Sequence, residues 1–263
     1  MNSSVPGKSM EQVQTEVVDR VLTIRMNRPE KKNALTSGMY EAMTEAIRAS
    51  DSDPQVRVLL ITGTQDCFTA GNDIADFAAA KPGSGPVAAL VFLETLAAAR
   101  KPIIAAVAGV AVGIGTTLLF HCDLVYAAPT ARFQLPFVNL GLCPEAGSSF
   151  VLPALVGTQK AAEVLFFGEP FGAEAAREYG LVNQIIAEGD LLSTAVAKAR
   201  TIAEKPPSAL QACKALLKKS SSEQIRQAMA RESEQFARAL QGPEAKEAMA
   251  AFLERRKPDF SRF

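Results

Sequence analysis

The sequence contains little of what metal sites and redox dithiols need. Its 263 residues include one histidine and four cysteines. The cysteines, Cys67, Cys122, Cys143 and Cys213, lie far apart and form no C-x-x-C pair. Zinc ribbons and thiol oxidoreductases require such pairs, so we predict neither a metal site nor a redox site. The single histidine, His121, argues against a Ser-His hydrolase and is better explained as a core residue.

The chain also lacks an excess of charge and a long apolar run. Lys+Arg and Asp+Glu number 28 each, which gives a formal net charge of zero. Without excess cations there is no broad attraction to nucleic-acid phosphates, so we expect no nucleic-acid partner. The longest apolar stretch, residues 103–120, is interrupted by glycines, which favours a buried strand and helix over a membrane span.

The two ends of the sequence carry no recognisable address. Residues 1–20 are polar and lack the apolar run that a signal peptide contains. The last residues, Ser261, Arg262 and Phe263, do not match the peroxisomal Ser-Lys-Leu signal. We therefore expect a cytoplasmic protein that does not associate with a membrane.

Strand and helix patterns alternate through most of the chain. Alternating or continuous apolar runs predict strands at 13–18, 21–26, 56–62, 103–107 and 124–127, the first two forming a hairpin. Helical spacing predicts helices at 36–51, 74–80, 86–100 and 113–120. Such alternation, with strands that are apolar throughout, indicates an α/β fold with buried, mostly parallel strands.

The strand patterns stop near residue 190. Helices are predicted at 195–203, 208–219, 222–240 and 244–255, separated by proline and glycine. We therefore divide the chain into a flexible N-terminus (1–12), an α/β core (13–190) and a helical C-terminal module (191–263).

Three short motifs have the residue types of a catalytic site, although each also has a structural explanation. Gly113 and Gly115 follow a predicted strand and leave backbone amides that can hold an oxyanion, or simply permit tight packing. Asp73 is placed to cap the predicted helix at 74–80. Glu145 follows a proline and suits the first turn of a helix, where the dipole lowers its pKa; apolar neighbours would raise that pKa, and we predict that desolvation dominates once substrate is bound.

Four motifs in order resemble the crotonase (enoyl-CoA hydratase/isomerase) superfamily. They are residues 27–35 (NRPEKKNAL), 68–74 (FTAGNDI), 101–115 (KPIIAAVAGVAVGIG) and 122–127 (CDLVYA). The resemblance implies a crotonase-type spiral of ββα units, a C-terminal trimerisation module, and homotrimers or hexamers. It also implies an acyl-CoA thioester substrate and no cofactor, since coenzyme A arrives as part of the substrate.

By the same resemblance, the amides of Asn72 and Ile114 stabilise a thioester enolate, and Ala70 and Gly113 beside them bind substrate. Each donor aimed at such a charge is worth roughly 10²–10³ in rate. Hydratases of this superfamily carry two glutamates, at positions that here read Thr117 and Phe137. Neither residue is a base near neutral pH, so a two-carboxylate hydration mechanism is disfavoured.

The remaining acid, Glu145, lies in residues 140–149 (LGLCPEAGSS), which resemble peroxisomal-type Δ3,Δ2-enoyl-CoA isomerases. One carboxylate suffices there to move a double bond from C3 to C2 through a dienolate. Three alternatives stay open: a ring-isomerising enzyme of phenylacetyl-CoA type breakdown, a hydratase-like enzyme that uses an atypical acid such as Asp76 or Glu94, and a catalytically silent acyl-CoA-binding protein.

The resemblance also implies contacts to coenzyme A. In the loop at 31–35 these are Lys31, Lys32 and the backbone of Ala34. Phe77 would line the path of the pantetheine or acyl chain. Phe252 and Lys257 near the C-terminus resemble residues that contact the nucleotide bound to a neighbouring subunit.

Overall fold

The computed structural model describes residues 12–74 and 87–263. The predicted flexible N-terminus and the predicted helix at 74–80 lie outside the described residues, apart from residues 12 and 74. Phe77 and Asp76 lie outside them as well.

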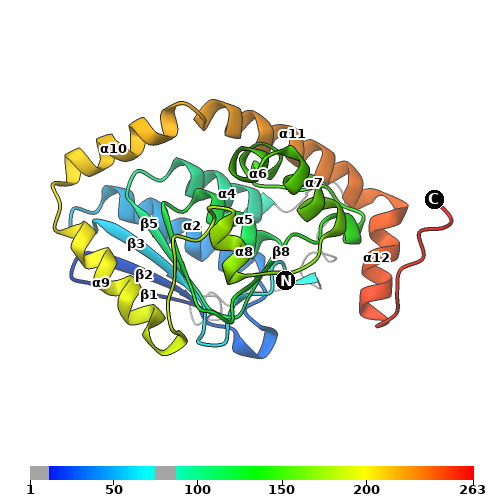
Figure 1. Ribbon diagram of the computed structural model, residues 1–263, viewed down its shortest axis with the longest axis horizontal. Coiled ribbons are helices and arrows are strands. Elements are labelled where there is room, and N and C mark those ends of the chain that lie inside the picture. Colours follow the sequence, from blue (N-terminus) through cyan, green and yellow to red (C-terminus); the bar gives the residue numbers. More distant parts are fainter. Residues whose placement is uncertain (1–11, 75–86) are drawn as a thin grey trace, which may run out of the picture.

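Two sheets form the centre of the fold (Figure 1). The first has six strands in the order β1 (Val13–Val18), β2 (Val21–Met26), β3 (Val58–Thr62), β5 (Ile103–Val107), β7 (Leu124–Ala127) and β10 (Gln184–Ile185). Only β1 and β2 pair in antiparallel fashion, through a turn at Asp19 and Arg20 with φ of 49° and 67°; the other pairs are parallel. The predicted α/β class with mostly parallel strands is therefore confirmed.

The second sheet runs in the order β4 (Cys67–Thr69), β6 (Val110–Val112), β8 (Arg132–Gln134) and β9 (Phe171–Gly172). β4, β6 and β8 are parallel, and β9 is antiparallel to β8. The chain repeatedly places one strand in the first sheet and the next in the second, as β3–β4, β5–β6 and β7–β8 do. The residues that follow β4, β6 and β8 therefore gather at one edge.

Helices follow the strand pairs closely. They are α2 (Ser37–Ser52), α4 (Val87–Ala98), α5 (Ile114–Thr117), α6 (Ser148–Val156), α7 (Thr158–Phe167) and α8 (Ala173–Glu178), with 3₁₀ turns η1 (Pro29–Lys31), η2 (Leu118–His121), η3 (Val138–Leu140) and η4 (Glu188–Asp190). The helix predicted at 113–120 is split between α5 and η2, which changes the pitch of the chain just after the glycines.

The central strands β3 and β5 of the six-stranded sheet are buried on both faces. In β3, Leu59 and Ile61 belong to the same apolar cluster as α2 and α4, whereas Val58 and Leu60 pack with α9. All five residues of β3 are buried, because successive side chains point to opposite faces that are both covered.

The C-terminal part consists of α9 (Leu191–Ala203), α10 (Pro207–Lys219), α11 (Ser222–Gln241) and α12 (Pro243–Leu253). α10 and α11 form a long arc over one side of the molecule (Figure 1). The arc is fastened to the core by Lys214 of α10, which is buried, donates to the Lys101 carbonyl at 2.6 Å and pairs with Asp123 at 2.7 Å. The function of residues 191–263 as an oligomerisation module stays a prediction.

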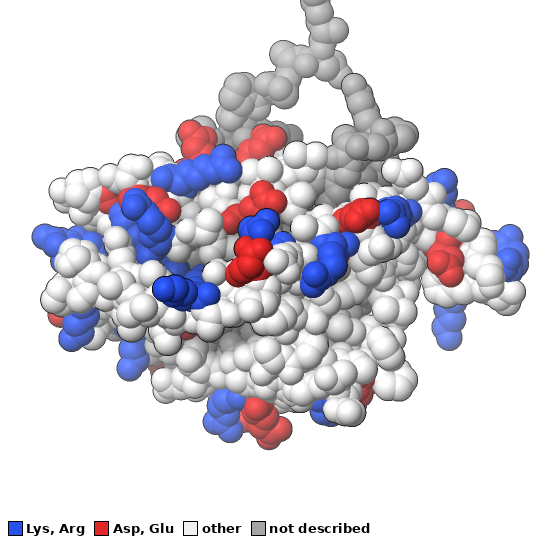
Figure 2. Space-filling view, turned by 90° about the horizontal axis from the view of Figure 1, so that it is seen from above, with Lys and Arg blue, Asp and Glu red and all other residues white. Residues whose placement is uncertain are grey.

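The surface seen from the side of this arc mixes both signs of charge (Figure 2). Blue and red side chains alternate there, as the net charge of zero would suggest. No helix within the described residues is both long and apolar enough to cross a membrane.

A buried lysine closes the C-terminal end of α2. Lys101 is 5% exposed, and its ammonium group donates to the carbonyls of Asp53 and Val56, each at 2.6 Å, and to that of Ser50. We predict that Lys101→Met, which keeps the apolar stem but removes the buried ammonium donor from three carbonyls, lowers the free energy of unfolding by about 2–4 kcal/mol. Urea denaturation followed by circular dichroism measures this value.

The matched control is Lys198→Met on an exposed position of α9. We expect it to change the free energy of unfolding by less than about 0.5 kcal/mol. Equal stability of the two variants would contradict the role assigned to Lys101.

Candidate active site

Two backbone amides stand at the same edge of the second sheet. Asn72 follows β4, and Ile114 follows β6, its parallel neighbour. Across residues 12–74 and 87–263, neither amide donates a recorded hydrogen bond, whereas the neighbouring Gly113 and Asp73 amides donate to Gln134 and Leu35. The structure thus places the two predicted oxyanion donors on adjacent strands and leaves both available.

Glycines permit the close approach of these two strand ends. A Cβ atom at Gly71 would lie 2.7 Å from the Val112 carbonyl oxygen, and one at Gly115 would lie 2.6 Å from Thr69 Cγ2. Gly71 also has φ of 89°, a conformation that other residues rarely adopt. The structure therefore shows the tight packing weighed from the sequence, while the role of the amides as oxyanion donors stays a prediction.

A buried asparagine that the sequence analysis did not single out fixes the first donor loop. Asn33 is fully buried with φ of 53°. Its side-chain amide donates to the backbone carbonyls of Cys67 at 2.7 Å and Phe68 at 3.1 Å. Thr69 donates back to the Asn33 carbonyl at 2.6 Å. Asparagine tolerates this left-handed conformation better than most residues. An asparagine in the predicted turn after Lys32 was therefore the sequence signal that could have identified Asn33.

Side-chain contacts also join the residues around Asn72 to the loop at 31–35, which is predicted to contact coenzyme A. Asp73, predicted as a helix cap, pairs with Arg28 at 2.6 Å, and the same guanidinium donates to the Ala34 carbonyl at 3.0 Å. Tyr40 of α2 donates its hydroxyl to the Asn72 side chain at 2.5 Å. These contacts bring Ala34 close to Asn72, the first of the two predicted oxyanion donors.

Glu145 is bound to the helix that begins with the second donor. The Thr117 hydroxyl donates to the Glu145 carboxylate at 2.5 Å. Thr117 ends α5, the one-turn helix that Ile114 begins. The three residues predicted to perform the chemistry are therefore linked: Ile114 and Glu145 through α5, and Asn72 through the pairing of β4 with β6.

Burial sets the acidity of Glu145. The residue is half-buried, and desolvation of its carboxyl group raises its pKa to about 7. The hydrogen bond from Thr117 lowers this pKa, and the charge of Glu232 raises it. A carboxyl group with such a pKa can both accept and return a proton near neutral pH.

Glu145 does not occupy the first turn of a helix, which corrects the sequence-based expectation. α6 begins at Ser148, with Gly147 as its N-cap residue at φ of 77°. The carboxylate at this helix end belongs to Glu232 of α11, which accepts the amides of Gly147 and Ser149. The dipole of α6 therefore acts on Glu232, which the sequence analysis missed because it lies far along the chain.

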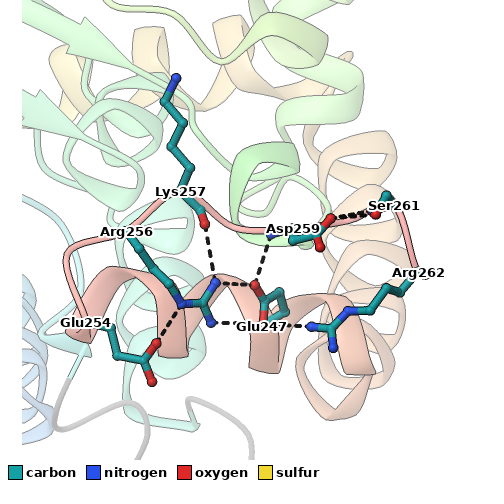
Figure 3. Close-up of polar contacts among 7 residues, drawn as sticks. All are labelled: Glu247, Glu254, Arg256, Lys257, Asp259, Ser261 and Arg262. Atoms are coloured by element: carbon teal, nitrogen blue, oxygen red, sulfur yellow. Dashed lines mark hydrogen bonds and ion pairs between the residues drawn. The ribbon is translucent and has the colours of Figure 1, made fainter.

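The remaining predicted residues occupy two regions. Lys31 and Lys32 are exposed at η1, and the Lys32 carbonyl accepts the amide of Ala70 at 2.9 Å. Phe252 on α12 is 58% exposed. Lys257 follows in the C-terminal tail, and its side chain points away from the ion-pair cluster around Glu247 (Figure 3).

The main cation in that ion-pair cluster is Arg256, the residue before Lys257. Arg256 pairs with Glu247 and with Glu254, and Arg262 approaches Glu247 at 3.5 Å. The Arg256 hydrogen bond is the main cause that lowers the pKa of Glu247 to about 2. Arg256 is thus engaged within its own tail.

The single histidine is a core residue, as predicted. His121 is 3% exposed, and its Nε2 donates to the Ala146 carbonyl at 2.9 Å. Burial lowers its pKa to about 4, so it is neutral at pH 7. Within the described part of the chain, no cluster of His, Cys, Asp or Glu could hold a metal ion.

Comparison with known proteins gives one family. Residues 16–262 match the family model described as enoyl-CoA hydratase/isomerase. The chain is 36% identical over 253 residues to "Probable enoyl-CoA hydratase echA8" of Mycobacterium leprae, covering 92% of this chain and 95% of that protein. It is 36% identical over 211 residues to enoyl-CoA delta isomerase 2 of Rattus norvegicus, covering 78% of this chain and 54% of that protein.

A third relative is 1,2-epoxyphenylacetyl-CoA isomerase of Escherichia coli, 31% identical with 96% of this chain and 99% of that protein covered. Among solved structures, an enoyl-CoA hydratase/isomerase of Pseudoalteromonas atlantica superposes with a TM-score of 0.89 and 38% identity, covering 95% of this chain and 99% of that chain. The names of these relatives thus include a hydratase and two kinds of isomerase.

We predict that Thr117→Val raises the pKa of Glu145 above about 7, because the hydroxyl stabilises the ionised carboxylate. Carbon-13 NMR titration of side-chain-labelled glutamates measures this pKa, with Glu145→Gln assigning the signal. The control is Thr44→Val, since the buried Thr44 hydroxyl has no hydrogen-bond partner among the described residues. A Glu145 pKa that stays the same or falls in Thr117→Val would refute the assignment.

Proposed function

Because the chain belongs to the enoyl-CoA hydratase/isomerase family, we propose that it is an acyl-CoA isomerase that moves a double bond from C3 to C2 of an enoyl-CoA thioester. One observation carries this proposal. The Glu145 carboxyl group has a pKa of about 7, and it accepts a hydrogen bond from Thr117 in the helix that Ile114 begins.

The proposed reaction is a proton shift between two carbons. The ionised Glu145 removes a proton from C2, and the electron pair moves into the thioester carbonyl to give a dienolate. The amides of Asn72 and Ile114 donate to the negative oxygen of this intermediate. Glu145 then returns the proton to C4 as the double bond forms between C2 and C3, so no water and no second base are consumed.

The absence of two hydratase-type glutamates supports isomerisation over hydration. At one of the two positions, Thr117 donates a hydrogen bond to Glu145 and so acts as an anchor. At the other, Phe137 is buried in an apolar cluster with Leu135 and Leu152. Neither side chain can activate water. Glu94, considered as an atypical acid, is exposed on α4.

The coenzyme A portion of the substrate is proposed to lie along the loop at 31–34 and the adjoining Ala70 and Gly113. Exposed Lys31 and Lys32 supply cations for its phosphates, and the backbone of Ala34 is held near Asn72 through Arg28 and Asp73. Phe252 and Lys257 are proposed to contact the nucleotide of a neighbouring subunit in a homotrimer or hexamer.

A ring-derived thioester is the second candidate substrate class, favoured by the similarity to the Escherichia coli epoxyphenylacetyl-CoA isomerase. A purified-enzyme panel of 3-enoyl-, 2-enoyl- and epoxide-bearing ring thioesters separates the possibilities. Turnover of 3-enoyl-CoA supports the proposal, turnover of the ring thioester alone supports the second candidate, and hydration of 2-enoyl-CoA as the dominant activity contradicts both.

We expect Glu145→Gln to lower kcat for trans-3-hexenoyl-CoA by about 10³-fold or more while product binding is retained, because the amide cannot carry the proton. The parent kcat/KM, which reports ionisations of the free enzyme, should rise with pH through an ionisation near 7, as Glu145 loses its proton to become the base. Stopped-flow absorbance gives the rates, and calorimetry gives the binding.

The matched control is Glu41→Gln, at an exposed glutamate of α2, which should keep the parent kcat. If Glu145→Gln keeps turnover within about tenfold of the parent, a residue other than Glu145 must transfer the proton.

The double variant Lys31→Ala, Lys32→Ala tests whether the loop at 31–34 binds the nucleotide part of coenzyme A. We predict that it raises KM for the CoA thioester about five- to tenfold at low salt, and less at high salt, since exposed ion pairs are screened. KM for the matching pantetheine thioester, which lacks the nucleotide, should not change. An equal rise for both substrates would mean that the loop acts on the acyl end or on folding.

A further inference from the structure

A buried carboxylate from a distant helix lies at the start of α6 and has no part in the mechanism above. Glu232 of α11 is 6% exposed. One of its oxygens accepts the Gly147 amide at 2.6 Å; the other accepts the Ser149 amide at 2.8 Å and the Ser149 hydroxyl at 2.5 Å. Within the described chain Glu232 forms no ion pair, so backbone and hydroxyl dipoles are what stabilise its charge.

The nine-residue helix α6 has no capping side chain of its own. Its N-cap residue is Gly147, which has no side chain that could accept the free amides of the first turn. Those amides carry partial positive charge and favour an anion. Glu232 supplies that anion across about eighty residues of sequence, as the separations of its hydrogen bonds show.

The turn that carries Glu145 is held from two sides. On one side, His121 donates to the carbonyl of Ala146, a residue forced to φ of 63°. On the other, Glu232 holds Gly147 and Ser149. A non-glycine residue at positive φ costs energy, so this turn keeps its shape through its neighbours and not through its own preference.

We propose that Glu232 is a positioning residue for Glu145: by accepting the amides of Gly147 and Ser149, it fixes the backbone that aims the Glu145 carboxylate at Thr117. This inference rests on the proposed function, because it gives Glu232 a part in the same proton transfer.

The charge of Glu232 also affects the acidity of Glu145. Burial is the main cause of the raised pKa of Glu145, and repulsion by Glu232 adds to it.

Cys143 precedes this turn, and two further titratable groups come from η2 and α10. The pKa of the Cys143 thiol is raised by burial and by the charges of Glu232 and Glu145. His121 of η2 is neutral near pH 7, and Lys218 of α10 reaches its carbonyl at 3.4 Å. Glu145 is therefore the group in the turn that we expect to titrate near neutrality.

The test is Glu232→Gln in the full-length protein, assayed with trans-3-hexenoyl-CoA across pH. We expect kcat to fall about tenfold, because Glu145 is displaced, with KM within about twofold of the parent. The ionisation of Glu145 should move to higher pH, both in the rate profile and in carbon-13 NMR of the free protein, because the displaced carboxylate loses the Thr117 hydrogen bond, which affects this pKa more than the charge of Glu232 does. The control is Glu234→Gln, an exposed glutamate on the same helix paired with Arg238, which should match the parent.

A purely structural cap would give a different result. In that case Glu232→Gln would lower the melting temperature but keep the parent kcat and the parent ionisation of Glu145, which overturns the inference. If Glu145→Gln is inactive, such a result leaves the proposed function intact; if Glu145→Gln keeps parent activity, the proposed function itself fails.

Ser149→Ala decides the matter should Glu232→Gln not fold. It removes one of the three hydrogen bonds to Glu232 and leaves the charge in place. We expect kcat to fall about two- to fivefold, with KM and the ionisation of Glu145 unchanged, since one hydrogen bond is lost. Parent kcat in a folded Ser149→Ala protein would overturn the inference.

Discussion

The hydrogen bond from Thr117 to Glu145 holds the candidate site together. It joins a carboxyl group on an irregular turn to the short helix that presents the Ile114 amide. The two amides proposed as oxyanion donors follow β4 and β6, which pair with each other, so all three groups lie at one edge of the same sheet. A site assembled in this way keeps its geometry before substrate arrives, which is the condition for electrostatic stabilisation of an enolate.

The same arrangement shows how a fold shared by hydratases and isomerases can change its chemistry. A hydratase of this family is expected to have a carboxylate at position 117; here a hydroxyl at that position donates to the one carboxyl group that is present. Desolvation raises the pKa of Glu145 to about 7, and Thr117 opposes this rise. The acid is thereby kept in the range where it can take up and return a single proton, without a second group to activate water.

Much of this organisation was predictable because it depends on local pattern. The hairpin, the buried strands β3, β5 and β7 and the helices from α9 to α12 follow from periodicity and from proline and glycine breaks. The positions of the two proposed donors, Asn72 and Ile114, came from the resemblance of the motifs to the family. The start of α6 was predicted wrongly, since Pro144 and Glu145 look like a first turn, whereas Gly147 is the N-cap residue and Glu232 supplies the anion.

The sequence by itself therefore determined the α/β class, the family and the identity of the candidate acid, Glu145. Only the tertiary structure decided how that acid is held and how strong it is. Asn33, Thr117 and Glu232 act through contacts that join segments about 30 to 85 residues apart. Such contacts leave no periodic signal, and a pKa depends on the burial and charges that folding brings around a group, not on its neighbours in the chain.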